Sequence, residues 1–186
     1  MSMMVQSGRF GGGAGILDGL SPTGAWSMSR NLLGSFAGSR YTTATGVSSL
    51  NDQSGNSRHL VQATGANQPV VTTAGPNSVT SADFDGLNDD LQGAALSAFI
   101  ANNSGFMIVS GIYHAITTDT SGAGIYQNNG LMGDILGYFG IVARSTGPNA
   151  WGFNYDGSYD IGSAPIATGT PYVFALRHEG GTVYMS

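Results

Sequence analysis

The sequence contains no cysteine and no lysine, and it has little charge of either sign. Without cysteine there are no disulfides, no thiol nucleophile and no thiolate ligands for a metal. The basic residues are six arginines, spread along a chain whose formal net charge is −5. A protein that neutralises phosphates needs a cationic stripe or patch, which this spacing does not supply. We therefore expect no nucleic-acid partner.

Only 9% of the residues are charged, against about 25% in an ordinary soluble domain. The polar surface must therefore come mainly from uncharged groups, which 30 glycines, 21 serines and 15 threonines supply. Long hydrophobic runs are also missing, since none approaches the roughly 20 residues that span a bilayer. Residues 1–10 lack the basic start and apolar core of a secretory signal. We expect no membrane partner and no export by that route.

The length of 186 residues suits one domain with one sizeable core. Residues 1–24 are rich in glycine and poor in large side chains, which predicts an arm or linker. Two interpretations stay open, a disordered leader and an arm that orders against a partner. In the second, apolar residues make the contacts, because methionine adapts to irregular apolar surfaces. These residues are Met1, Met3, Met4, Val5 and Phe10.

Beyond residue 24 the pattern is one of short strands bounded by Gly, Asn, Asp, Ser or Pro clusters, which predicts an all-β fold. The predicted strands are 40–47, 59–63, 69–73, 79–84, 105–116, 135–143, 150–155, 172–178 and 182–185. Residues 26–33 are compatible with one or two helical turns, and 91–100 with a short helix or a loop.

Two of these strands have further features. Residues 106–113 are apolar at both alternating positions, which is typical of a strand in the middle of a sandwich rather than at an edge. Around Glu179, Gly180 and Gly181 the chain reads as strand, tight turn, strand, which predicts a hairpin. The last strand leaves three options open: it pairs at a sheet edge, the chain continues in a longer product, or a neighbouring subunit completes the sheet.

Two sequence words resemble a known family. The first is the run Asn51-Asp52-Gln53-Ser54-Gly55-Asn56-Ser57-Arg58-His59-Leu60-Val61-Gln62-Ala63, followed by Asn67-Gln68-Pro69, and the second is Phe84-Asp85-Gly86-Leu87-Asn88-Asp89-Asp90-Leu91. In this order they resemble LamG-like, concanavalin A-like jelly-roll domains. Residues 25–38 are similar, more weakly, to the opening of the arabinofuranosidase B catalytic domain and of bacteriophage virion proteins that share it. The resemblance covers residues 25–186 and implies a two-sheet antiparallel jelly-roll sandwich.

The chain departs from that family pattern in two places. Leu50 stands where the family commonly has an aromatic residue, two positions before Asp52. The carboxy-terminal end is short for the family, so the jelly roll is expected to be incomplete there.

Glycoside hydrolysis is the first chemistry to weigh, because it needs two carboxyl groups flanking the scissile bond. The glucanases with this fold use an E-x-D-x-E strand, and this chain has the single Glu179. Glu179 lies beside two glycines, where a turn explains it better, and Asp156 lies in a predicted hairpin turn before Asp160. The histidines, His59, His114 and His178, show no metal spacing. We predict that the protein is not an enzyme and has no catalytic residues.

Two polar loops have both a structural and a ligand interpretation. Asp85, Asn88 and Asp89 offer oxygen ligands that calcium prefers, and LamG-like domains often bind calcium. The same residues beside Gly86 equally form a turn held by side chain to backbone hydrogen bonds, which we favour. The loop from Asp52 to Asn56 is likewise expected to be a structured loop first and a ligand-contacting loop second.

A glycan site is predicted around Trp151, because aromatic faces interleaved with planar polar groups suit sugar rings. The candidate residues are Trp151, Asn154, Tyr155 and Tyr159. The alternative, which we favour for most of them, is that they fill a core and its turns.

The resemblance and the missing chemistry together predict a non-enzymatic bacteriophage virion protein, as a capsid decoration, head-fibre or tail-associated protein. It is expected to be assembled in the host cytoplasm, to dock to other virion proteins through the arm, to form a homo-oligomer and to touch host-surface glycans. Two alternatives stay open: an arabinofuranosidase-like carbohydrate-active enzyme or a fragment of one, and a secreted lectin module.

Overall fold

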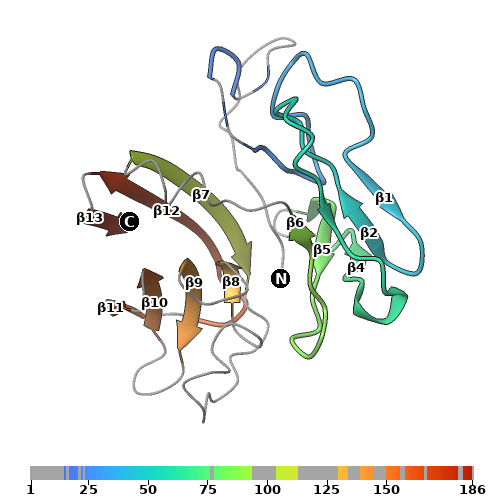
Figure 1. Ribbon diagram of the computed structural model, residues 1–186. Helices are drawn as coiled ribbons and strands as arrows, with labels where there is room; N and C mark the ends of the chain where they lie inside the picture. Colours follow the sequence, from blue (N-terminus) through green and yellow to red (C-terminus); the bar gives the residue numbers. More distant parts are fainter. Residues whose placement is uncertain are drawn as a thin grey trace. The chain divides into compact units, whose positions relative to one another are not determined.

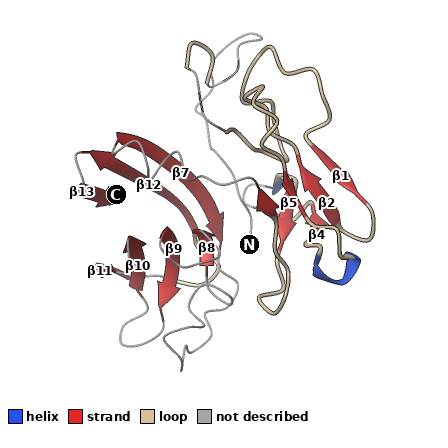
Figure 2. Cartoon of the chain, viewed as in Figure 1, coloured by secondary structure: helices blue, strands red, loops and turns tan. Residues whose placement is uncertain are grey.

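The computed structural model shows antiparallel strands and a short helix of the 3₁₀ type at Gly65–Asn67 (Figure 2). The described residues are 15, 17–20, 22, 24–75, 78–93, 104–112, 130–133, 139–144, 150–155, 158–165, 167–179 and 182–185. The all-β class predicted from the strand pattern is therefore confirmed for this part of the chain. In the same residues, no helix has the length and apolar character needed to cross a membrane.

The chain divides into two compact units, each described by itself (Figure 1). The amino-terminal unit comprises Ser2–Asp85 and Asp89–Ala94, and the carboxy-terminal unit comprises mainly Gly86–Asn88 and Ala95–Ser186. The predicted boundary between an arm and a domain at residue 24 stays a prediction.

The amino-terminal unit contains two small antiparallel sheets. The first has the order β1-β2-β3-β6 and the second pairs β4 with β5. The bounds are β1 Tyr41–Thr43, β2 Val47–Leu50, β3 Leu60–Val61, β4 Val70–Thr72, β5 Ser81–Asp83 and β6 Gln92–Gly93. The expected single strand 40–47 is thus wrong, since residues 44–46 form the turn of a hairpin between β1 and β2.

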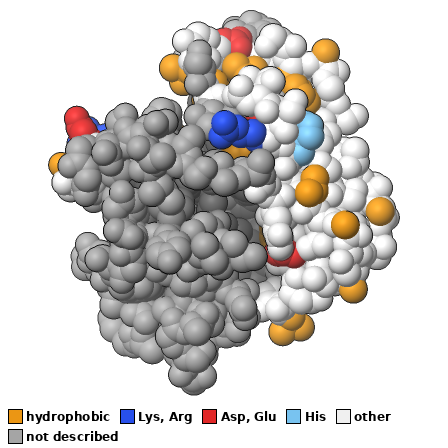
Figure 3. Space-filling view, viewed as in Figure 1, with side chains coloured by type: hydrophobic (Ala, Val, Ile, Leu, Met, Phe, Trp, Pro, Cys, Tyr) orange, Lys and Arg blue, Asp and Glu red, His pale blue; other side chains and the backbone are white. Residues whose placement is uncertain are grey.

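The core of this unit forms around Met28, Val47, Leu50 and Ala82, all at most 3% exposed. Leu50 is 2% exposed and fills a core position. Partly buried hydrophobic residues pack around this cluster: Trp26, Tyr41, Leu60, Val71, Phe84 and Leu91. Its visible surface is mostly uncharged, with hydrophobic side chains scattered singly (Figure 3), as the serine- and threonine-rich composition predicts.

The carboxy-terminal unit has two further sheets, with the orders β11-β10-β9-β8 and β13-β12-β7. The bounds are β7 Ser104–Ile112, β8 Gly130–Gly133, β9 Phe139–Arg144, β10 Ala150–Tyr155, β11 Ser158–Pro165, β12 Pro171–Glu179 and β13 Thr182–Met185. The register Glu179↔Thr182 confirms that β12 and β13 pair as the predicted hairpin. The register Tyr155↔Ser158 pairs β10 with β11. The turn residues predicted between these strands, Gly180-Gly181 and Asp156-Gly157, lie outside the described residues.

One expectation for this unit is not met. Among the described strands β7 pairs with β12 alone and ends the sheet order, whereas its apolar sequence predicted a central strand. Ile108 on β7 is 40% exposed, so this apolar strand is not buried on both faces in the part described.

Candidate functional site

The loop from Asp52 to His59 is the most densely hydrogen-bonded polar feature of the first sequence word, and we call it the Asp52 loop. The Asp52 side chain is 4% exposed. Its Oδ1 accepts hydrogen bonds from the backbone N–H groups of Ala25 and Ser54, both at 2.9 Å. Its Oδ2 accepts from the Ser54 hydroxyl at 2.7 Å and from the Arg58 N–H at 3.0 Å.

These four donors use the whole accepting capacity of the carboxylate, which is about four lone pairs on two oxygens. Burial by itself raises the pKa of Asp52, but the hydrogen bonds from Ser54, Ala25 and Arg58 outweigh it and bring the pKa below its ordinary value. The group is therefore ionised at neutral pH and cannot serve as a general acid. The loop is structured, as the preferred prediction has it, and its carboxylate is turned inward.

Gln53 likewise satisfies backbone hydrogen-bonding groups of the segment before it. Its side chain is 3% exposed, its Oε1 accepts the Leu32 N–H at 2.6 Å, and its Nε2 donates to the carbonyls of Ser27 and Arg30, both at 3.2 Å. Residues 26–33 form bends rather than the one or two helical turns expected. Because a distant side chain satisfies their backbone groups, this segment does not need helical hydrogen bonds.

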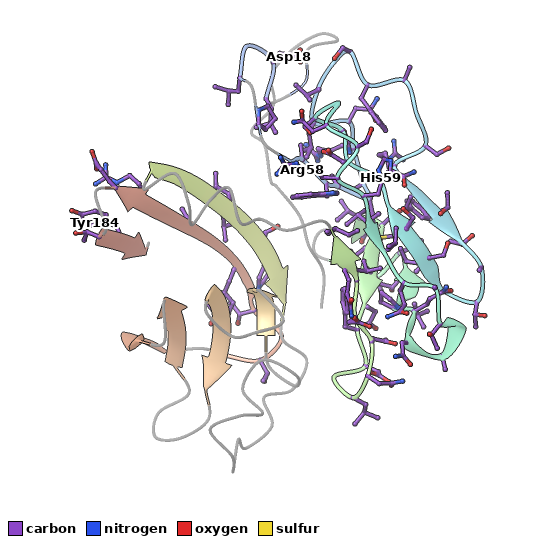
Figure 4. The ribbon with its side chains drawn as sticks, viewed as in Figure 1. Asp18, Arg58, His59 and Tyr184 are labelled. Carbon is purple, nitrogen blue, oxygen red and sulfur yellow. The ribbon has the colours of Figure 1, made fainter. Side chains whose placement is uncertain are left out.

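The outer side of the Asp52 loop is tied to the same segment. The Trp26 indole N–H donates to the Arg58 carbonyl at 2.8 Å, and the Asn56 amide donates to the Pro22 carbonyl at 3.0 Å. His59 Nδ1 accepts the Asp52 N–H at 3.0 Å, and Figure 4 shows His59 and Arg58 on this unit. Gly55 has φ +86°, in the left-handed region that favours glycine. Through these hydrogen bonds the Asp52 loop holds the described residues of the segment 22–32 in place.

The end of the first sequence word and the second sequence word are joined to each other by a similar set of bonds. Gln68, 6% exposed, accepts the Gly46 N–H at 2.9 Å and donates to the Gln62 carbonyl at 2.8 Å. The Gln62 amide donates to the Asp90 carboxylate, and the Asp90 N–H donates to the Asn67 carbonyl at 3.2 Å. The residues behind the family resemblance therefore connect strands and loops of one unit.

The predicted calcium ligands lie in the loop after β5. The Asp85 N–H donates to Asp89 Oδ2 at 3.0 Å, and the Asp89 N–H donates to Asp85 Oδ1 at 3.4 Å, so each carboxylate caps the other residue's backbone. Burial and the neighbouring charges of Asp85 and Asp83 raise the pKa of Asp89, against the lowering effect of the Asp85 N–H. Within the described ranges, no group of three His, Cys, Asp or Glu side chains could hold a metal ion. Calcium binding through Asp85, Asn88 and Asp89 stays a prediction.

The predicted glycan residues lie on two neighbouring strands of the carboxy-terminal unit. Trp151, Asn154 and Tyr155 belong to β10, and Tyr159 belongs to β11, where it pairs with Asn154. Since strand positions alternate between the two faces of a sheet, positions 154 and 159 share one face, and positions 151 and 155 belong to the other. Their side chains lie outside the described part, and the glycan site stays a prediction.

Part of the predicted arm is visible, and it contacts its own unit. The Leu17 N–H donates to the Leu32 carbonyl at 2.8 Å, and the Gly34 N–H donates to Asp18 Oδ1 at 2.8 Å. Asp18 is labelled in Figure 4. A Cβ at Gly15 would meet backbone atoms of residues 32–34 at 2.4 Å, so the approach requires glycine. The predicted contact residues Met1, Met3, Met4, Val5 and Phe10 lie outside the described residues.

One cluster was not predicted from the sequence. On β12 and β13, Arg177 lies 4.6 Å from the ring centroid of Tyr184, and its Nη2 lies 3.5 Å from Glu179 Oε2. The register Arg177↔Tyr184 and Glu179↔Thr182 places these four residues on one face of the sheet, and we call them the Tyr184 patch. Tyr184 is 49% exposed. The hairpin predicted from Gly180-Gly181 determines which residues of β12 and β13 lie opposite one another, so this cluster could have been predicted from the sequence.

Comparisons of the chain with protein-family models, with curated proteins and with solved structures found no match.

Proposed function

We propose that this chain is a non-enzymatic structural protein of a bacteriophage virion, a capsid decoration, head-fibre or tail-associated protein. The observation behind the proposal is that residues of both family-like sequence words form internal hydrogen-bond networks in the amino-terminal unit. Residues that hold the architecture of this unit together support an architecture like that of the family they resemble. In this proposal residues 25–186 form a concanavalin A-like, LamG-like jelly roll.

Two carboxyl groups of the described part, Asp52 and Glu179, support a role without catalysis, while Asp156 and the Asp160 side chain lie outside that part. Asp52 is ionised and its oxygens are fully used by internal donors. Glu179 is on an open strand position, 65% exposed and paired with Arg177. A glycosidase acid needs a raised pKa in a site that excludes water, next to a second carboxyl group. Neither residue has such surroundings.

In the proposed assembly, the glycine-rich arm docks to other virion proteins and the jelly roll faces outward as a homo-oligomer. The arm would contribute the apolar residues Met3, Met4, Val5 and Phe10, and the outward surface would meet host glycans. Repetition on a particle multiplies weak single contacts, which suits a protein with few strong ligand groups. The protein would be assembled in the host cytoplasm and located in the virion.

A second candidate function is a secreted lectin module. The Tyr184 patch favours it, because an exposed ring beside planar charged groups is a sugar-binding arrangement wherever the protein is located. The reading frames next to the gene separate the two proposals: capsid, portal or tail genes agree with the virion, and secretion or adhesin genes with the lectin.

The direct test is a cryo-EM reconstruction of the particle purified from the lysate of host cells that produce the chain. We expect density for the β units on the particle surface, with residues 1–24 against a capsid or tail protein. A matched particle preparation from a deletion of residues 1–14 should lose that density. If mass spectrometry of the particle detects no peptide of this chain, the virion proposal is wrong.

A further inference from the structure

We propose that the Tyr184 patch, Arg177, Glu179, Thr182 and Tyr184, is a binding site for a neutral oligosaccharide. The inference deepens the proposed function, since it names the ligand class and the residues of an outward surface. It places the site on the β12–β13 hairpin, apart from the four residues that sequence reasoning singled out on β10 and β11. Figure 4 shows Tyr184 on β13.

The first step is the geometry of the aromatic side chain. Tyr184 is 49% exposed on β13, which stands at one end of the order β13-β12-β7 among the described strands. The Arg177 guanidinium carbon lies over the ring at 4.6 Å from its centroid, which is a cation–π distance. An amphipathic ring with a polar neighbour matches a sugar, which has C–H groups on its ring faces and hydroxyls at its rim.

The second step is the charge of the patch. Arg177 and Glu179 have opposite charges 3.5 Å apart, with side chains 61% and 65% exposed. The pair offers both donors and acceptors of hydrogen bonds but no net charge. A carboxylated or sulfated sugar would gain at Arg177 and lose at Glu179, in a chain that is already at −5. The charge balance therefore favours a neutral glycan.

The third step is the continuation of the same face. The register Ala175↔Ile108 extends it from β12 to β7, where Val173 on β12 is 52% and Ile108 on β7 is 40% exposed, and it ends at Ser110, the partner of Val173, which is 2% exposed. Positions 173 and 177 are about 13 Å apart along a strand. This length exceeds one sugar ring, so an oligosaccharide gains contacts that a monosaccharide cannot make.

The experiment measures binding of cellohexaose, xylohexaose and maltohexaose to the full chain by saturation-transfer NMR and isothermal titration. We expect at least one of them to bind. Tyr184→Ala removes the ring and Arg177→Ala removes a charged hydrogen-bond partner, so each should weaken that binding about tenfold or more. Tyr184→Phe keeps the ring and should stay within about threefold of the natural chain, on the same scale. Val70→Ser, a change at an exposed residue of the other unit, is the matched control.

The outcomes separate this inference from the proposed function. If a hexasaccharide binds and the Tyr184 and Arg177 variants bind it equally well, the site is elsewhere and this inference is wrong, while glycan recognition stands. If no hexasaccharide binds, both this inference and the glycan part of the proposal are wrong, while particle assembly is still decided by cryo-EM. If Tyr184→Ala instead changes the mass of the particle-free protein in light scattering, the patch is an interface between copies and this inference is overturned.

Discussion

The Asp52 loop and the Tyr184 patch use the same kinds of polar side chains in opposite ways. In the loop, a carboxylate at 4% exposure has four internal donors, and nothing of its bonding capacity remains for another molecule. In the patch, a guanidinium and a carboxylate that are more than half exposed share a single contact. The comparison indicates that a polar motif's role follows from where its hydrogen bonds go, and the two regions should respond to substitution very differently.

The largest expected effect comes from removing the Asp52 carboxylate. Asp52→Ala would leave the buried N–H group of Ala25 and the partly buried N–H groups of Ser54 and Arg58 without their acceptor, which should lower the free energy of unfolding by about 3 kcal/mol. Urea unfolding measures this, followed by Trp26 fluorescence in a Trp151→Phe background so that the signal reports on the amino-terminal unit. Glu179→Ala in the same background is the control. A loss below about 1 kcal/mol would show that water replaces the carboxylate and that the Asp52 loop does not hold the preceding segment in place.

A slightly smaller effect is expected from two glycines that differ in what surrounds them. A Cβ at Gly46 would lie 2.6 Å from the carbonyl oxygens of Gln68 and Pro69, whereas nothing lies within 4 Å of one at Gly55. Gly46→Ala should therefore cost about 2–3 kcal/mol, because backbone has to move. Gly55→Ala should cost about 1 kcal/mol, from its positive φ alone. The same urea titration measures both, and equal costs would contradict the close approach at Gly46.

The sequence predicted what local chemistry determines and missed what distant residues determine. The pairing of β12 with β13 was predicted, because a Gly-Gly pair between two apolar runs is a local hairpin signal. The break at Gly46 was missed, since the need for glycine comes from residues 68 and 69, and the bends at 26–33 come from Gln53. The pairing of β10 with β11 could not be predicted from the sequence either. Residues at positions on two faces of the sheet were therefore predicted to form one glycan site.

The third prediction concerns acid. The pKa of Asp52 in the folded chain is below its ordinary value of 3.8, so its stabilising contribution is complete above that value and disappears as pH falls through the native pKa. Asp52→Asn should therefore be less stable than the natural chain by about 2 kcal/mol at neutral pH, and the gap should narrow steadily below pH 3.8. Thermal unfolding at a series of pH values measures the gap. A gap that is constant with pH would mean that charge plays no part.

Asp89 gives the opposite sign and serves as the comparison. Its pKa in the folded chain is raised, because burial and the charges of Asp85 and Asp83 disfavour ionisation. The folded state then gains from the protonated form, so the stability that this group contributes is present below the ordinary value of 3.8 and is lost as pH rises through the raised pKa. Asp89→Asn, which keeps an acceptor for the Asp85 N–H, should raise the melting temperature slightly at neutral pH and leave it unchanged in strong acid. A lower melting temperature of Asp89→Asn at neutral pH would instead mean that the charged carboxylate stabilises the fold. A parallel sample with added calcium tests whether a bound cation is the cause.

The smallest expected change in stability is at the Tyr184 patch, and it tests whether that face is free. An exposed cation–π contact and an exposed ion pair each contribute about 0.5–1 kcal/mol at most. Arg177→Ala, Tyr184→Ala and the double variant should therefore each lie within about 1 kcal/mol of the natural chain in thermal unfolding followed by circular dichroism, with a coupling energy near the lower end of that range. A small coupling together with a large loss of oligosaccharide binding identifies groups that act on a ligand rather than on the fold. A loss of more than about 2 kcal/mol would place the patch with the Asp52 loop as architecture, and the contrast between the two regions would fail.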